Sequence, residues 1–395
     1  MEIQYTLTEN HHTMKKYLSI SLLLLVALSC TDDKSADEIL KFETRSNCSI
    51  VDDCASKVEI LPLRTAGAMI GEVMLCKETA AGFMVVDYDY NIFCFNASGE
   101  LQNKIARVGR GPQEYVSVDD VAVDRQGNLY ILSQGTDVLV YTASGEFKGR
   151  HTLEAAASSV SVLDDGRLCF TLCHEEDAAY ADDRLLFADA ELKPLQSALP
   201  LRKTTLSAYG FGFEKLFRRP GATSGLYFQS HDRLQYSIDP QGNILKTYTL
   251  DFGDYAAPEE LLQCRSQEEL VDLVMKHDLY YVNNAFESRN FLLFNVIFQQ
   301  KAAVPEVAVW IWDKRSRKSY IEHYPNEASP LFQLLQFPVN LAEDDTVWYL
   351  CDNEMLQAGQ EEFAFLQALD IPSEVGYSLL KLRLALDGTY PKNSL

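Results

Sequence analysis

The segment VGRGPQEYVSVDDVAVDRQGNLYIL, residues 108–132, joins a glycine-bracketed loop to two consecutive strand patterns. Apolar and polar residues alternate in VDDVAVD, and a second apolar run, LYIL, follows the turn DRQG. This combination is typical of a tight β-hairpin. The segment therefore predicts a crossing loop, GRGPQEYVS, that leads into the first hairpin of a β-sheet unit.

The same unit returns along the chain as an apolar strand, a polar gap, a second strand, a turn and a third strand. Six copies begin at Gly82, Gly127, Gly166, Gly225, Phe291 and Thr346. Spacings of roughly 40 to 65 residues are typical of propeller blades, each a four-stranded sheet. With a leading strand such as VDDVAVD innermost in each unit, the repeat predicts an all-β, six-bladed β-propeller. The alternative is a β-sandwich with insertions.

The sixth copy ends soon after its third strand, YSLLKLRL, and lacks an outer strand. The segment KVEILPLR, residues 57–64, precedes the first blade and has no partner in its own repeat. We expect it to pair with the last blade, because closing the ring with an N-terminal strand removes an open sheet edge.

Two long insertions have helical patterns. SQEELVDLVMKHD begins with Ser266 and has Glu269 three residues later, which is the spacing of a capping box. EMLQAGQEEFAFLQAL repeats an apolar face at Phe363, Leu366 and Leu369. We expect both helices to pack as lids over the blades; the alternative is that they bind a partner.

The GRGPQEY string and the hairpin after it resemble the segment between the first two blades of NHL-like, six-bladed β-propeller lipoproteins of Gram-negative bacteria. The resemblance extends from VEILPL to LLKLRL, essentially the whole mature chain. It departs at Gln113, where a second glycine is common in that family. The resemblance implies the fold and an extracytoplasmic location, but little about activity.

The N-terminal sequence has the pattern of an export signal. From Met14, MKKYLSISLLLLVALSC contains two lysines, a short apolar core and a small residue before Cys30. We interpret residues 1–29 as a lipoprotein signal peptide with its start at Met14, residues 30–56 as a polar tether and residues 57–395 as the propeller. Lipidation of Cys30 predicts an outer membrane lipoprotein that faces the periplasm or the cell surface. The alternative is an ordinary secretory peptide.

Charge and cysteine content narrow the possible partners. The formal net charge is −22, which excludes general binding to nucleic acid, because acidic surfaces repel phosphate backbones. An oxidising compartment permits disulfides, and Cys48 and Cys54 are close enough in sequence to form one. Whether they are bridged stays open at this stage.

In a propeller, the links between blades and the links between the two middle strands of a blade emerge on the same face. Every long insertion of this chain belongs to one of these two kinds of link, so we expect the binding site on that face. For the arginines there we favour pairing with local carboxylates such as Glu114, Asp119 and Asp120, which would hold the loops. The alternative is that arginine and aromatic side chains bind an anionic small molecule or a glycan. The candidate ligand-binding residues are Arg107, Arg110, Glu114, Tyr115, Tyr209, Arg218, Arg219 and His231.

The function predicted is that of a lipid-anchored binding propeller for such a ligand or for an envelope protein partner. The alternative is a propeller enzyme, a lyase, hydrolase or lactonase, using His174, His231 or His277 and carboxylates on the same face. Catalytic residues stay unassigned, and catalysis itself stays open. No sequence motif indicates a cofactor or a metal site, although a divalent cation is compatible with the enzyme alternative.

Overall fold

The structure is a computed structural model. It describes residues 37–43, 48–173, 179–180, 182–200, 214–217, 222, 224–264, 266–301, 303–324 and 334–385.

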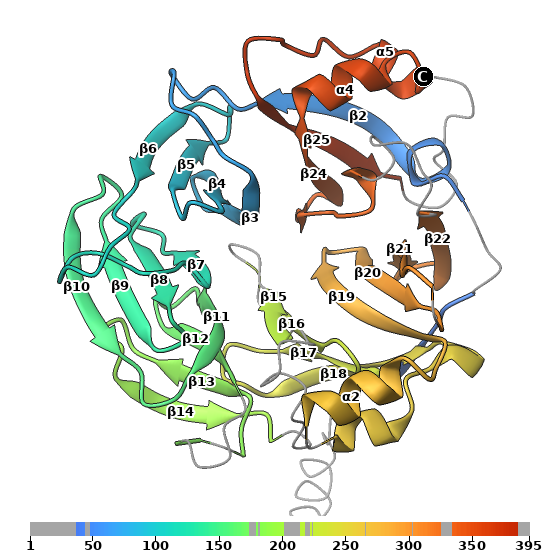
Figure 1. The fold of residues 1–395 in the computed structure, drawn as a ribbon, viewed down its shortest axis with the longest axis horizontal. Helices are drawn as coiled ribbons and strands as arrows, with labels where there is room; N and C mark the ends of the chain where they lie inside the picture. The colour runs from blue at the N-terminus through green and yellow to red at the C-terminus, as the bar shows by residue number, and fades with distance from the viewer. Residues whose placement is uncertain are drawn as a thin grey trace, which may run out of the picture. The chain divides into compact units, whose positions relative to one another are not determined.

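Six small sheets form a ring, which confirms the predicted six-bladed propeller (Figure 1). Each blade is named here from its innermost strand outward. Blade 1 contains β3 (Val73–Thr79), β4 (Gly82–Asp87), β5 (Ile92–Asn96) and β6 (Leu101–Ile105). Blade 2 contains β7 (Asp120–Val123), β8 (Leu129–Ser133), β9 (Asp137–Tyr141) and β10 (Phe147–Thr152). Blade 3 contains β11 (Ala157–Val162), β12 (Leu168–Leu172), β13 (Leu185–Ala188) and β14 (Pro194–Ala198).

The second half of the ring includes strands from the N-terminal segment. Blade 4 contains β15 (Glu214–Phe217), β16 (Gly225–Gln229), β17 (Leu234–Ile238), β18 (Ile244–Asp251) and, outermost, β1 (Glu38–Lys41). Blade 5 contains β19 (Leu279–Glu287), β20 (Phe291–Gln299), β21 (Glu306–Asp313) and β22 (Lys318–Tyr324). Blade 6 contains β23 (Asn340–Leu341), β24 (Thr346–Asp352), β25 (Tyr377–Leu384) and β2 (Ala55–Pro62).

The core lies between the blades. Six apolar clusters of the described residues each contain buried side chains from two neighbouring sheets, including the pair formed by blades 6 and 1. Across that last pair the rings of Phe83 and Trp348 meet edge to face, with centroids 6.1 Å apart. Central strands are apolar on both faces because each sheet is covered by a neighbour on either side.

The hairpin turns follow one recurring design. Asp124 Oδ1 accepts hydrogen bonds from the N–H groups two and four residues later, and Asp239 does the same. The third residue after each aspartate is a glycine with a positive φ, 82° at Gly127 and 84° at Gly242. Such a turn needs both a short acceptor side chain and a residue without Cβ, which explains the D-x-x-G pattern.

The N-terminal segment closes the ring, as predicted. β2 pairs antiparallel with β25, from Ala55 opposite Leu384 to Pro62 opposite Ser378. Before it, β1 lies parallel to β18 and adds a fifth strand to blade 4. β1 lies within the segment that we expected to be a polar tether. The sequence signal of β1 is short, because Leu40 and the adjoining Phe42 are the large buried apolar residues of this stretch.

The GRGP loop crosses from blade 1 to blade 2 and is held by hydrogen bonds within the loop. Gly109 N–H donates to the carbonyl of Tyr115, and Tyr115 N–H donates to that of Arg107. Glu114 folds back so that its carboxylate accepts from Gly111 N–H at 2.8 Å. A Cβ on Gly109 would lie 2.0 Å from that carboxylate, so glycine is required while Glu114 stays in place.

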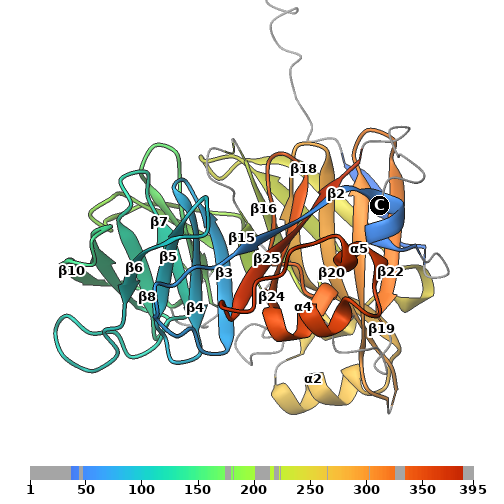
Figure 2. The ribbon, with the colours of Figure 1, turned by 90° about the horizontal axis from the view of Figure 1, so that it is seen from above.

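Two insertions form the predicted helices. α2 (Gln267–Val274) has Ser266 as its N-cap, whose side chain accepts from Glu269 N–H. The second insertion forms α4 (Asn353–Gly359), capped by Asp352, and the short α5 (Ala364–Gln367). Two 3₁₀ turns, η3 (Gly253–Tyr255) and η4 (Glu259–Gln263), precede α2. α2 and α4 protrude on the same side of the ring, the lower side in Figure 2.

Candidate site in the central channel

The innermost strands of all six blades border a small central cavity of about 90 Å³. Its wall is unusually polar for a place so deep in the molecule, because several of these strands present a charged, amide or hydroxyl side chain. The polar residues are Lys77 and Glu78 on β3, Asp120 on β7, Ser159 and Ser161 on β11, Lys215 on β15, Asn284 on β19 and Asn340 on β23.

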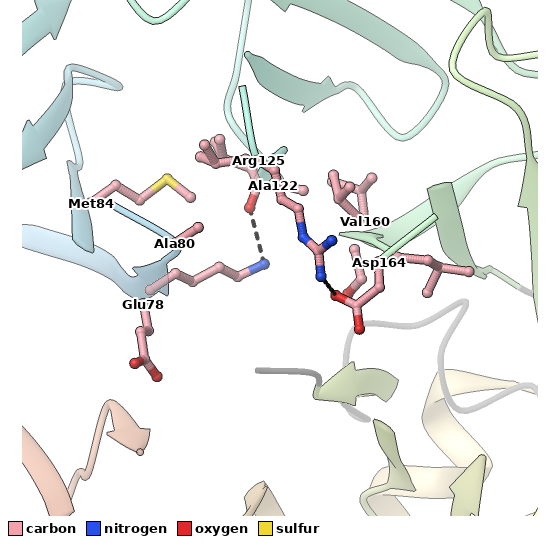
Figure 3. A pocket seen from close by; sticks show the side chains of 13 residues that line it. Glu78, Ala80, Met84, Ala122, Arg125, Val160 and Asp164 are labelled. Carbon is pink, nitrogen blue, oxygen red and sulfur yellow. Dashed lines mark hydrogen bonds and ion pairs between the residues drawn. The ribbon is translucent and has the colours of Figure 1, made fainter. Parts of the chain in front are cut away.

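A larger cavity of about 360 Å³ adjoins this channel between blades 1, 2 and 3 (Figure 3). We call it the vestibule. It shares Lys77, Glu78 and Ser161 with the channel, and Met84 and valines of β7 and β11 form much of its wall. At its rim Arg125 and Asp164 point toward each other and form an ion pair of 3.0 Å. Its volume lies at the lower end of the range for small-molecule pockets.

The vestibule lies at the carboxyl ends of β3, β7 and β11, where these strands turn into their hairpins. The helical insertions emerge at the other ends of the strands. The vestibule therefore lies opposite the face on which we expected the binding site. The insertion face has a cavity of about 300 Å³ between residues 63–70 and 374–377, and a small one beside His231.

An ion pair fixes the charge pattern of the channel. Lys77 Nζ lies 2.5 Å from Asp120 Oδ1 and also donates to the carbonyl of Val121. The Asp120 side chain is only 1% exposed, and its second oxygen accepts from Val160 N–H on the neighbouring blade. Asp120 therefore ties blades 1, 2 and 3 together beside the channel.

Lys215 is the second cation of the channel. It is half-buried, and burial lowers the pKa of its ammonium; the carboxylate of Asp120 opposes this shift and the positive charge of Lys77 adds to it. Within the part of the chain that the structure describes, Lys215 forms no ion pair. A desolvated ammonium without a counter-ion gains most from an added anion.

The neighbouring polar groups are held by hydrogen bonds. Asn340 donates to the carboxylate of Glu78, and the hydroxyl of Ser161 donates to the carbonyl of Leu216. The channel wall is thus preorganised by contacts between blades. Our sequence reasoning missed these residues. The available signal was a charged residue inside an otherwise apolar innermost strand, as in VMLCKET.

Two of the predicted ligand-binding residues have structural contacts. Tyr115 is fully buried, and its hydroxyl contacts the carbonyl oxygens of Tyr90 and Ile105. Burial raises the pKa of Tyr115 to about 12. Glu114 holds the GRGP loop through Gly111 N–H. Both side chains stabilise the crossing between blades 1 and 2.

Arg107 and Arg110 are exposed on that crossing and form no ion pair with another described residue. Asp119 and Asp120, which we weighed as their partners, have other contacts: Asp119 accepts from Ser117 and Gly135, and Asp120 binds Lys77. The predicted residues Tyr209, Arg218 and Arg219 lie outside the described residues.

His231 lies on the insertion face but deep in the protein. Its ring stacks on Tyr281 at 4.8 Å, and burial lowers its pKa to about 4. His277 is exposed beyond the end of α2, and His174 lies outside the described residues. Of the three predicted histidines, the two that the structure describes, His231 and His277, line neither the channel nor the vestibule.

The residues that the structure describes contain no group of three or more histidine, cysteine, aspartate or glutamate side chains arranged to hold a metal ion. None of the helices among these residues is long and apolar enough to cross a bilayer. Cys30 and the predicted signal peptide lie outside the described range.

The fold and the channel define a six-bladed β-propeller with a polar central site. The chain belongs to the family described as "Domain of unknown function (DUF4934)", whose model matches residues 40–371. No curated protein matches the chain.

Two solved structures show the same fold. The "Putative exported protein" of Bacteroides fragilis has a TM-score of 0.68 and 19% identity, covering 89% of this chain and 100% of that one. A member of the DUF4221 family from Bacteroides vulgatus has a TM-score of 0.50 and 10% identity, covering 83% and 96%. At these identities the similarity concerns the fold alone.

Proposed function

We propose that this chain is an exported, lipid-anchored binding propeller that holds the anionic group of a small molecule in its central channel. Export is supported by the signal pattern before Cys30 and by the similarity in fold to the Bacteroides fragilis protein, which is described as exported. In this proposal Cys30 carries the lipid, and the propeller is displayed from the outer membrane like the NHL-like lipoproteins that the sequence resembles.

The observation that carries the ligand class is Lys215. Its ammonium is desolvated, lies near the Lys77–Asp120 pair and has no ion-pair partner among the described residues. A carboxylate, sulfate or phosphate group beside Lys215 would compensate the buried charge. The apolar vestibule next to the channel supplies room for the rest of the ligand.

The test compares glucuronate with glucose, which lacks the carboxylate, by calorimetry on the full chain. We expect glucuronate to bind and glucose to bind far more weakly. Lys215→Gln removes one charge-assisted hydrogen bond, worth about 1.5–3 kcal/mol, so affinity should fall about ten- to hundredfold. The control is Lys276→Gln, because that side chain is 66% exposed on the insertion face and should leave affinity unchanged.

Arg110→Ala separates this channel site from the site predicted on the insertion face. If glucuronate binding is lost in Arg110→Ala and kept in Lys215→Gln, the ligand belongs to the insertion face and the channel proposal is wrong. Equal binding of glucose and glucuronate would also refute an anion site.

The enzyme alternative assigned the acid and base roles to histidines, which would have to line a cavity beside carboxylates. His231 is buried against Tyr281, and His277 is exposed at the end of α2. We therefore propose binding as the function.

A further inference from the structure

Residues 48–54, which we call the clasp, join blade 5 to blade 6 on the outside of the ring. Cys48 N–H donates to the carbonyl of Ile321 on β22, and the carbonyl of Cys54 accepts from Ala385 N–H just after β25. Between them, Ile50 N–H donates to the buried carboxylate of Glu322. The clasp therefore spans the joint beside the strand that closes the propeller.

The clasp is a tight turn with internal bonds. The five residues Ile50–Cys54 form one turn of π-helix, η1, with Ser49 as its N-cap. Ser49 Oγ accepts from Asp52 N–H, and Asp53 N–H donates to the carbonyl of Ser49 at 2.7 Å. This folded turn brings the two ends of the clasp together.

Cys48 packs against the apolar cluster that contains Cys54. A hydrogen bond from Cys54 is the main cause that lowers the pKa of Cys48, against burial and the negative charges of Glu322 and Asp53. The same contact, together with burial, raises the pKa of Cys54. Cys54 is 3% exposed and Cys48 is only half-buried, so the more acidic thiol is also the more accessible one.

We propose that Cys48 and Cys54 form a modification site, a dithiol that is oxidised to a disulfide by exchange with a small external disulfide and then locks the clasp. The Cys48 thiolate attacks one sulfur of the external disulfide; a mixed disulfide forms and one external thiolate leaves. Cys54 gives its proton to water, attacks the Cys48 sulfur and releases the second external thiolate. The external disulfide is reduced by two electrons, and the cysteine pair is oxidised by the same two.

The consequence follows from the position of the clasp. A covalent link across this turn restricts the states in which residues 48–54 separate from blades 5 and 6. An exported protein meets an oxidising environment, in which such a bond persists. This inference does not depend on the ligand of the channel.

The test uses the full chain, purified with reductant and then incubated with oxidised glutathione. After alkylation of free thiols and digestion with trypsin, residues 46–57, SNCSIVDDCASK, are released as one peptide that contains both cysteines. We expect this peptide to lose both alkylation sites and two hydrogen atoms, without a lasting glutathione adduct. Buried Cys76 and Cys351 should stay reduced. A wild-type peptide that keeps two alkylated thiols, or that retains glutathione, overturns the proposal.

The two single variants test the order of events. Cys54→Ser should stop at the mixed disulfide and retain glutathione on Cys48, whereas Cys48→Ser should take up little glutathione, because Cys54 is buried. Hydrogen exchange of the clasp amides should slow several-fold on oxidation of the wild type, with β8 unchanged. Faster adduct formation on Cys54 than on Cys48, or unchanged exchange in the clasp, contradicts the proposed roles. If a variant fails to fold, the mass of the wild-type peptide and the exchange rates of the wild-type clasp still test whether the disulfide forms.

Discussion

Replacing Asp120 by asparagine should destabilise the chain far more than the same change at Asp164. Both carboxylates belong to ion pairs near the vestibule, so the chemistry of the substitution is matched. Asp120 is 1% exposed and accepts hydrogen bonds from the N–H groups of Val121 and Val160 in addition to its contact with Lys77. The partner of Asp164, Arg125, is 63% exposed.

The expected magnitude follows from these contacts. Asparagine has one acceptor oxygen and no charge, so it loses at least one charge-assisted hydrogen bond, worth about 1.5–3 kcal/mol. It also leaves Lys77 without a counter-ion, which costs about 3–5 kcal/mol for a fully buried pair. The Lys77 side chain is 28% exposed, so water reduces that second cost. We expect a total loss of about 3 kcal/mol at Asp120 and less than about 1 kcal/mol at Asp164.

Urea denaturation followed by tryptophan fluorescence measures both values, because Trp310, Trp312 and Trp348 are all buried in the blades. The double variant Lys77→Met with Asp120→Asn should recover part of the loss, since no unpaired charge then remains beside the channel. Equal losses at Asp120 and Asp164 would refute the interpretation of the Lys77–Asp120 pair. So would a double variant less stable than Asp120→Asn alone.

Burial lowers the pKa of His231 from 6.5 to about 4. The contribution of neutral His231 to the free energy of unfolding should therefore be fully present above pH 6.5. It should fall by about 2 kcal/mol at pH 5, because the unfolded chain then binds a proton that the folded chain excludes. His231→Phe should remove that slope in urea midpoints, and a slope that persists would contradict it. Gly109→Ala should cost about 1 kcal/mol, because the new Cβ displaces the Glu114 carboxylate from Gly111 N–H; with Glu114→Ala the two losses should not add. Deleting residues 1–62 removes β2 and exposes the edge of β25, so size-exclusion chromatography should show aggregates; a monomer would show that closure is dispensable.

Most of the fold could be predicted because its signals are local and repeated. The alternation in VDDVAVD and the aspartate–glycine spacing of the turns return in several blades, and each repeat supports the others. The closing strand could be placed because one blade lacked a strand and one segment lacked a partner. The pairing of β1 could not be predicted in this way, because blade 4 already has four strands and the EILK segment is short.

The site was harder to predict because burial and ion pairing determine which charged side chains are available to bind a ligand. In the sequence, Glu114 and Tyr115 lie close to Arg110 in the GRGP loop, and all of them were predicted to bind the ligand. In the structure, Glu114 and Tyr115 are bound to the backbone, and only the arginines are exposed. Lys77 and Asp120 are separated by 43 positions (120 − 77) and make contact only because blades 1 and 2 are neighbours.

The charge balance of the whole chain explains why a recessed lysine is a stronger candidate than exposed arginines. A net charge of −22 repels anions at long range, and exposed cations are further weakened by salt, which screens charges over about 8–10 Å. A group inside a desolvated wall is screened far less, so its local field outweighs the distant acidic surface. Asp120 pairs with Lys77, and the Glu78 carboxylate of the same wall accepts from Asn340, so Lys215 is the channel cation without an ion-pair partner among the described residues. Discrimination between an anionic ligand and its neutral counterpart would then depend on this one ammonium group.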